Sequence, residues 1–315
     1  MNFDEAEKIA AAVLYEGYIL YPYRPTAIKN RQRWNFGTLY PRVYAQAQRP
    51  EEPFRLVAEC LAVADETASL YVRLRFLQLV RQLVSNEQSV PPLTDPSLAW
   101  DEAVERTSEH SNLRIRELLA SPLSLTMPAA PELQVALTIA AQKLEDGTCK
   151  LRIEVQNVSP LPSGADATRE EALPASFVSA HLLLGITQGE FVSLLEPAEA
   201  CRASVAACAN QGVFPVLVGE EPERRMMFCS PIILYDYPKV APESAGDFFD
   251  GTEMDEKLTL RVLTLTDAEK QEMQNGDPRA RRILERTEAL TDDAMLKAHG
   301  VIRELRDIRG DAHDR

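Results

Sequence analysis

The sequence lacks the signatures by which common catalytic and cofactor sites are recognised. It contains no GxGxxG or GxxxxGKS/T phosphate-binding loop, no HExxH zinc motif and no GxSxG nucleophile turn. Its histidines are scattered, and their spacing predicts neither a metal site nor a Ser-His-Asp set. We therefore predict no catalytic residue, no metal ligand and no cofactor. The histidines are His110, His181, His299 and His313, of which His181 lies in an apolar stretch typical of a buried core residue.

Cysteines are few, and none form a CxxC pair. An odd, scattered set is typical of reduced thiols in a cytosolic protein. Cys201 and Cys208 share an expected helix, where their separation corresponds to about 10 Å of rise, too far for a disulfide. We expect structural thiols at all of these positions, which are Cys60, Cys149, Cys201, Cys208 and Cys229.

Long apolar runs are also missing. The longest, AHLLLGI from Ala180, is far shorter than the roughly 18 residues of a membrane-spanning helix. The first residues, MNFDEAEK, are acidic and do not have the basic and apolar regions of a secretory signal. These features predict a cytoplasmic protein that does not insert into a membrane.

Positive charge is scarce. The chain has 34 Lys and Arg against 48 Asp and Glu, a formal net charge of -14. A nucleic-acid backbone would be repelled at long range, which argues against a nucleic-acid partner. The 315 residues are 45% hydrophobic, which is enough for one large domain or two ordinary ones with a full core.

The first half of the chain shows strand patterns. Leu70, Val72, Leu74 and Phe76 alternate with polar residues, which predicts one buried face of a strand. Further on, LQVALTIAAQKL and CKLRIEVQNV flank EDGT, a turn signal that predicts an antiparallel hairpin. A polar, turn-rich stretch at residues 161–174 is the best candidate for a domain boundary or a long loop.

The second half mixes strands and helices. SFVSAHLLLGI and GEFVSLLEP predict paired strands around Thr187-Gln188-Gly189, and a helix is expected from Pro197 to about Ala209. GVFPVLVGE and MMFCSPIILYDYP predict two more strands. The TDAE stretch from Thr266 to Glu269 is a capping box, and Pro278 suits the first position of a further helix.

The fold class that follows is α+β, largely antiparallel sheet, sandwich-like or open, with a helical C-terminal segment. We expect a β-rich N-terminal region with one leading helix at residues 1–160. An α+β region that ends in about three helices follows at 161–315, and the two regions can also form one continuous domain.

Charge is distributed unevenly along the chain. Residues 17–50 carry six cations and no acid, whereas residues 243–256 carry six acids and no cation. The cationic segment is also rich in tyrosine and tryptophan. The residues expected to bind in the basic aromatic loop are Arg24, Lys29, Asn30, Arg31, Arg33 and Trp34, and those of the acidic cluster are Asp247, Asp250, Glu253, Asp255 and Glu256.

Three interpretations of these clusters remain open. The two segments can dock on one another inside the fold through bidentate Arg–carboxylate pairs. Alternatively, the basic loop faces outward and holds an acidic partner or an anionic ligand. In the third, the acids bind a hard cation through oxygen ligands or do acid–base chemistry.

Several segments also carry a family resemblance. These are AVLYEGYILYPYRPTAIKNRQRWNFGTLYP, SFVSAHLLLGITQGEFVSLLEP, GVFPVLVGE and SPIILYDYPKVAPESAGDFFDGTEMDEKLTLRVLTLTDAEK. They resemble an uncharacterised bacterial family associated with gene clusters for uptake NiFe hydrogenases. The resemblance implies an accessory or maturation role beside a hydrogenase, and it supplies no catalytic residues.

Two hypotheses about function follow. The first is a non-catalytic accessory, assembly or scaffold protein with a protein partner, such as a hydrogenase subunit or maturation factor. The alternative is a carboxylate-based, metal-dependent enzyme that uses acids between Asp247 and Glu256.

Overall fold

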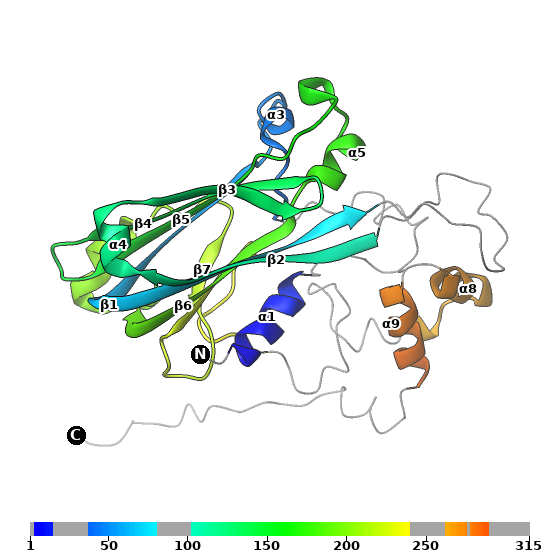
Figure 1. Ribbon diagram of the computed structural model, residues 1–315. Helices are drawn as coiled ribbons and strands as arrows, with labels where there is room; N and C mark the ends of the chain where they lie inside the picture. Colours follow the sequence, from blue (N-terminus) through cyan, green and yellow to red (C-terminus); the bar gives the residue numbers. More distant parts are fainter. Residues whose placement is uncertain (1–2, 15–36, 81–101, 240–261, 276–277, 290–315) are drawn as a thin grey trace, which may run out of the picture.

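The structure is a computed structural model that describes residues 3–14, 37–80, 102–239, 262–275 and 278–289. It confirms the α+β class, with an antiparallel sheet as its central element (Figure 1). The strand order is β3-β4-β5-β1-β6-β8-β7, and β2 also pairs with β1. The strands are β1 (Arg55–Val80), β2 (Glu102–Arg114), β3 (Leu123–Ala130), β4 (Leu133–Lys143), β5 (Cys149–Asn157), β6 (Val178–Phe191), β7 (Phe214–Leu217) and β8 (Met226–Ser230).

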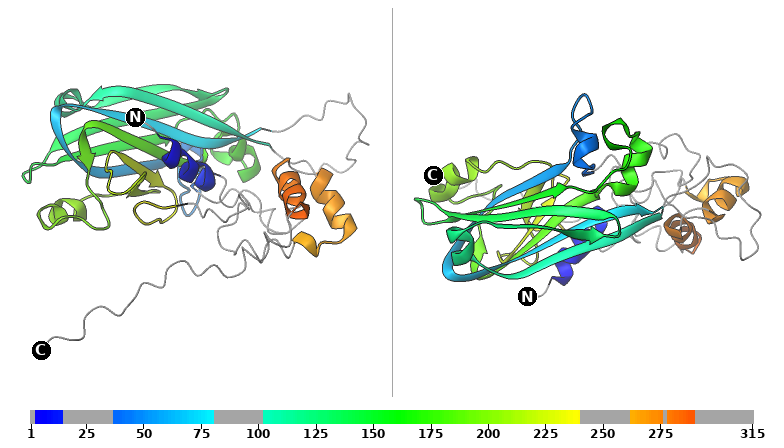
Figure 2. Two further views of the ribbon diagram at one scale, coloured as in Figure 1. Left: turned by 90° about the horizontal axis from the view of Figure 1, so that it is seen from below. Right: turned by 45° about the horizontal axis from the view of Figure 1, so that its top comes forward.

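The helical elements among the described residues are mostly short. They lie around the sheet and beyond its ends (Figures 1 and 2). They are α1 (Asp4–Leu14), α3 (Arg42–Ala45), α4 (Ile115–Ala120), η2 (Gly164–Asp166), α5 (Arg169–Ala172), η3 (Leu173–Ala175), η4 (Glu199–Cys201), α6 (Arg202–Ala206), α8 (Asp267–Asn275) and α9 (Pro278–Glu288).

The long strand β1 organises the sheet. Its first part pairs with β5, its second part pairs with β2, and β6 runs antiparallel along its other edge. The predicted alternation is confirmed, because Leu70, Val72, Leu74 and Phe76 are all buried in the same core cluster. Since β5 and β6 both pair with β1, strands from before and after residues 161–174 belong to one sheet.

The predicted β4–β5 hairpin is confirmed. The strands pair from Val135 opposite Asn157 to Lys143 opposite Cys149. In the turn, Gly147 has a φ of +85°, a left-handed conformation that favours glycine. The Asp146 carboxylate accepts hydrogen bonds from the Thr148 amide at 2.9 Å and the Thr148 hydroxyl at 2.6 Å. The turn residues therefore act as their sequence suggests.

The predicted strand pair around Thr187-Gln188-Gly189 is wrong, because these residues lie within the single strand β6. Gln188 has the positive φ of a turn residue, 56°, but the chain does not reverse there. The stretch lies opposite an irregularity in β1, where pairing shifts between Ala64 and Ser69. The turn signal thus marks a bulge in two long strands.

The main core lies on one side of the sheet. It contains Phe76 and Phe177, whose rings stack with centroids 4.4 Å apart. The sheet curls so that its end strand β3 approaches β2, with Met127 Sδ 3.9 Å from Ser108 Oγ. Helix α4 packs against β1 and β4 where β2 leads into β3.

Helix α1 covers the other side of β6 and β8, as both views in Figure 2 show. Its apolar residues pack on Leu183 and Phe228. On β1, Arg73 forms ion pairs with Glu7 of α1 and Glu109 of β2. The leading helix expected from the sequence is therefore a packed part of the fold.

The helices α8 and α9 pack on one another. The capping box before α8 is confirmed, because the Glu269 amide donates to Thr266 Oγ1 at 3.3 Å and the Glu269 carboxylate accepts from the Thr266 amide at 2.9 Å. The helix expected from Pro197 to Ala209 is shorter than predicted, since only η4 and α6 form and no residue of α6 is buried. None of the described helices is long and apolar enough to cross a membrane.

Candidate functional site

The residues predicted from charge runs lie outside the described residues. This holds for Arg24, Lys29, Asn30, Arg31, Arg33 and Trp34 of the basic aromatic loop. It holds equally for Asp247, Asp250, Glu253, Asp255 and Glu256 of the acidic cluster. Of the six cations at residues 17–50, the structure describes Arg42 and Arg49. Gly37, which belongs to the cationic segment, contacts Pro231, which precedes the acidic segment by twelve residues.

A surface pocket of about 350 Å³ lies at this meeting point, and we call it the Gly37–Pro231 pocket. Its volume is in the range of small-ligand sites, which is roughly 300–1,000 Å³. The walls combine backbone, apolar rings and one residue of each charge sign. The lining residues are Gly37, Thr38, Leu39, Tyr40, Glu52, Pro53, Arg169, Gly212, Phe214 and Pro231.

The first wall is fixed by pairing with residues just before and at the start of β6. Leu39 and Phe177 exchange backbone hydrogen bonds of 2.8 and 3.0 Å, and the Ala180 amide donates to the Gly37 carbonyl at 2.9 Å. The fully buried Asn157 side chain donates to the Leu39 and Ala175 carbonyls, each at 2.8 Å. Residues far apart in the sequence are thereby held in register around the pocket.

Gly37 is required at this wall for two reasons. Its φ is +51°, and a Cβ atom placed there would lie 2.6 Å from Pro231 Cβ and 3.4 Å from the Ser179 Cα. We expect Gly37→Ala to lower the free energy of unfolding by about 2 kcal/mol, measured by chemical denaturation.

Gly147→Ala is the matched control for this variant. Gly147 also has a positive φ, but a Cβ atom there would meet nothing within 4 Å. It should therefore cost only the backbone strain, about 1 kcal/mol. Equal destabilisation by the two substitutions would contradict a steric role for Pro231.

The polar side of the pocket is formed by Arg169 and Tyr40. The Arg169 Nε donates to the Tyr40 hydroxyl over 3.0 Å. Burial raises the pKa of Tyr40 above its ordinary value, and the Arg169 charge opposes this without reversing it. Tyr40 is therefore a neutral phenol at physiological pH, and the charges that line the pocket are those of Arg169 and Glu52.

Two arginines flank the same wall. Arg42 follows Tyr40 by two positions, and Arg55 follows Pro53 by two. Their guanidinium groups lie over the ring of Phe54, with Cζ–centroid distances of 5.7 and 5.8 Å. Arg42 is exposed and forms no ion pair with any carboxylate of the described residues. We call Arg42, Phe54 and Arg55 the arginine–phenylalanine surface.

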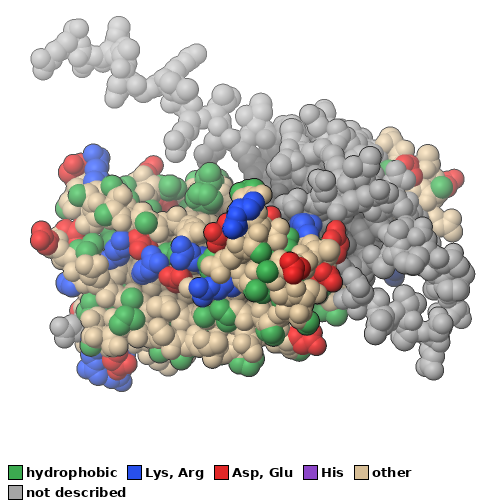
Figure 3. Space-filling model, turned by 90° about the horizontal axis from the view of Figure 1, so that it is seen from above, with side chains coloured by type: hydrophobic (Ala, Val, Ile, Leu, Met, Phe, Trp, Pro, Cys, Tyr) green, Lys and Arg blue, Asp and Glu red, His purple; other side chains and the backbone are tan. Residues whose placement is uncertain are grey.

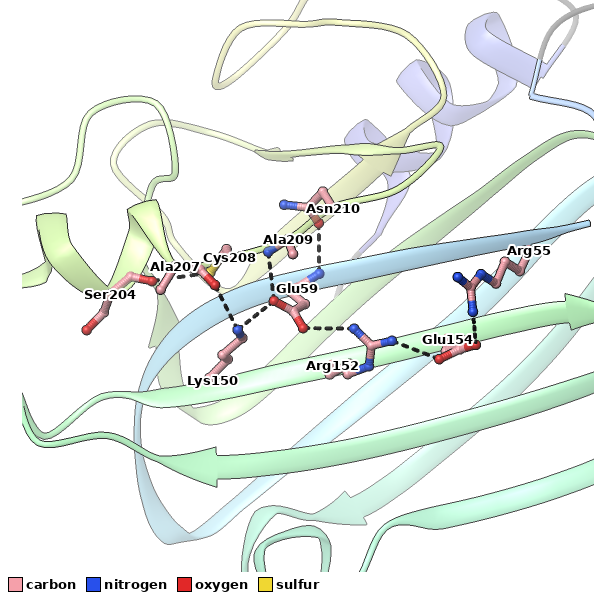
Figure 4. Close-up of polar contacts among 10 residues, drawn as sticks. All are labelled: Arg55, Glu59, Lys150, Arg152, Glu154, Ser204, Ala207, Cys208, Ala209 and Asn210. Carbon is pink, nitrogen blue, oxygen red and sulfur yellow. Dashed lines mark hydrogen bonds and ion pairs between the residues drawn. The ribbon is translucent and has the colours of Figure 1, made fainter. Parts of the chain in front are cut away.

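A second polar cluster lies on β1 and β5 (Figure 4). Glu59 is only 5% exposed, and its carboxylate contacts Lys150 Nζ at 2.6 Å and Arg152 Nη1 at 2.9 Å. The Ala209 amide donates to it at 2.7 Å, while the Glu59 amide donates to Asn210 at 2.8 Å. Both carboxylate oxygens are thus occupied, and the cluster fastens the segment after α6 to the sheet.

His181, Cys60 and Cys229 are buried in the core. His181 is fully buried, its Nδ1 lies 2.8 Å from the Ser179 carbonyl, and burial lowers its pKa to about 3. Burial also raises the pKa of the Cys60 and Cys229 thiols. These groups are therefore neutral at physiological pH. Among the described residues, no group of His, Cys, Asp or Glu side chains is arranged to hold a metal ion.

No sequence pattern pointed directly to the pocket. Glu52 lies beside Glu51 and Arg169 precedes two glutamates, in short charged stretches without a recognisable pattern, and Phe214 is one of several strand aromatics. Gly37, Thr38, Leu39 and Tyr40 belong to the cationic segment at residues 17–50, which was singled out by its charge and not by these residues. Comparisons with other proteins add no name to this site: no protein-family model matches the chain, and no curated protein matches it significantly.

Proposed function

We propose that this protein is a non-catalytic accessory or assembly protein that binds a NiFe hydrogenase component, and that the Gly37–Pro231 pocket is its binding site. The family resemblance supplies the partner. The observation that carries the proposal is the convergence of the resembling segments at this pocket.

The convergence involves all four segments. The first contributes Gly37 to Tyr40 and the third contributes Gly212 and Phe214. The fourth contributes Pro231, and the second pairs with Leu39 through Phe177. These segments span the chain from its first helix to beyond β8, yet they share one small surface.

The chemistry of the surface supports binding. Phe214 lines the pocket with 44% of its area exposed, and beyond Pro231 the side chains of Ile233 and Tyr235 are 77% and 63% exposed. Asp236 fixes this stretch by accepting from Ser193 Oγ at 2.5 Å and the Leu217 amide at 2.8 Å. Apolar and aromatic side chains held in fixed positions are typical of protein-binding surfaces.

The test is capture of the hydrogenase from cells that express it, with the tagged full-length chain as bait. We expect Phe214→Ser to reduce capture at least fivefold, because truncation of a central aromatic anchor costs more than 1 kcal/mol. Val63→Ser is the matched control, since Val63 is 59% exposed on β1 and does not line the pocket. Equal loss with both variants, or no capture by the wild type, would refute the proposal.

The alternative enzyme hypothesis makes a different prediction. If carboxylates between Asp247 and Glu256 hold a catalytic cation, purified protein should contain stoichiometric divalent metal. Elemental analysis of the full-length chain measures this directly. Metal that is lost when these acids are replaced by amides would favour the alternative over the accessory role.

A further inference from the structure

We infer that the pocket and the arginine–phenylalanine surface together recognise a partner segment in which acidic residues flank one apolar side chain. This inference rests on the proposed function for the identity of the partner. It adds the chemistry of the segment that is bound.

The acidic preference follows from the geometry at Phe54. Its ring contacts the guanidinium groups of both Arg42 and Arg55 through cation–π interactions, which place the two positive charges beside the same side chain. Arg42 contacts no carboxylate of the described chain, and Arg55 has only Glu154, at 3.7 Å. Positioned guanidinium groups that lack a close internal partner favour carboxylates of a second molecule.

The face of the molecule drawn in Figure 3 also carries cationic side chains. Toward the middle of the face seen in Figure 3, Lys and Arg side chains gather, with Asp and Glu side chains among them. On β5, Arg152 is 41% exposed although it pairs with Glu59 and Glu154. In a chain with a net charge of -14, such a local group of cations attracts an acidic segment to this face.

The apolar preference follows from the pocket. Leu39, Pro53, Phe214 and Pro231 provide apolar surface around about 350 Å³. The two arginines lie within two positions of the lining residues Tyr40 and Pro53, a span of at most ~7 Å along the chain. An extended peptide can therefore place one side chain in the pocket while a neighbouring carboxylate reaches Arg42 or Arg55.

The inference can be tested with defined peptides. The probe is a fluorescein-labelled peptide with three glutamates on each side of one tryptophan, and binding to the full-length chain is measured by fluorescence anisotropy at low salt. A second peptide has glutamine for each glutamate, and a third has alanine for tryptophan. We expect the first to bind most tightly, and its affinity to fall as ionic strength rises.

Variants separate the contribution of the two arginines from that of the apolar pocket. Joint replacement Arg42→Ala and Arg55→Ala should raise the Kd of the glutamate peptide roughly fivefold and leave the glutamine peptide unchanged. Phe214→Ser should remove most of the difference between the tryptophan and alanine peptides. Arg116→Ala, an exposed arginine on α4, should change nothing. Thermal melting of each variant confirms that it is folded.

Two results would overturn the inference: equal binding of the glutamate and glutamine peptides, or equal loss from Arg116→Ala and from the double variant. These results are distinct from failure of the proposed function. Hydrogenase capture without peptide preference would refute the acidic recognition alone. Peptide preference without hydrogenase capture would refute the proposed partner alone.

Discussion

Replacement of Glu59 by alanine is expected to lower the free energy of unfolding by about 3–5 kcal/mol, the usual cost of removing one partner of a buried ion pair. The carboxylate is buried and satisfies Lys150, whose side chain is only 18% exposed. It also accepts from the Ala209 amide. Without it, Lys150 retains only the Ala207 carbonyl, at 3.0 Å, among the described residues, and the Ala209 amide loses its acceptor. The segment after α6 then stays joined to β1 through backbone hydrogen bonds of Val57 and Glu59. Urea denaturation measures the difference.

The control for this variant is Glu190→Ala. Glu190 is an exposed carboxylate on β6, and its loss should change stability by less than ~0.5 kcal/mol. If both substitutions cost the same, the destabilisation would come from net charge and not from the Glu59 contacts.

The same residue gives the protein an acid-sensitive component of stability. Burial by itself raises the pKa of Glu59, but hydrogen bonds from Ala209, Lys150 and Arg152 together hold that pKa below its ordinary value of 4.5. Because the pKa is lower in the folded chain, ionised Glu59 stabilises the fold above about pH 4.5, and this stabilisation is lost as pH falls through the folded-state pKa. Glu59→Gln should therefore be less stable at neutral pH and show a weaker decline in acid.

Asn157→Ala is expected to cost about 2–4 kcal/mol, because it leaves several buried polar groups without their hydrogen bonds. The Asn157 amide nitrogen donates to the Leu39 and Ala175 carbonyls, and its oxygen accepts from the Ser159 amide at 3.0 Å. The loss should also loosen the pocket wall at Leu39. Urea denaturation measures the cost, and binding of the glutamate–tryptophan peptide by the folded variant reports on the wall.

Gln156→Ala is the control on the same strand. The Gln156 side chain is partly exposed and donates to Glu154 at 2.7 Å, so its removal should cost under ~1 kcal/mol. A stability of Asn157→Ala equal to that of this control would show that the buried amide is not needed to join the pocket wall to β5.

Sequence patterns correctly predicted those elements that depend on hydrogen bonds between residues a few positions apart in the chain. Asp146 and Gly147 form the β4–β5 turn, and Thr266 and Glu269 form the α8 cap, because each depends on residues a few positions apart. The stretch Thr187-Gln188-Gly189 has similar turn chemistry, yet β1 pairs with β6 on both sides of it. Long-range pairing decided that case, and it cannot be read from a short window.

The candidate site also depends on long-range contacts that a short stretch of sequence does not reveal. Charge runs drew attention to residues 17–50 and 243–256, since clustering along the chain is visible in a sequence. Arg169, Glu52 and Phe214 form no such run, and long-range contacts bring them together: Arg169 donates to Tyr40, the Tyr40 amide donates to Pro53 beside Glu52, and Phe214 pairs with Ser230 next to Pro231. A site assembled from separate segments is defined by the topology of the sheet.

The order of these segments along the chain has a consequence for biosynthesis. The pocket begins at Gly37 and is completed by Pro231, which contacts Gly37 directly. A nascent polypeptide that has not reached Pro231 lacks part of this cavity, however much of the sheet has formed. The finished surface can therefore form only after translation has passed Pro231.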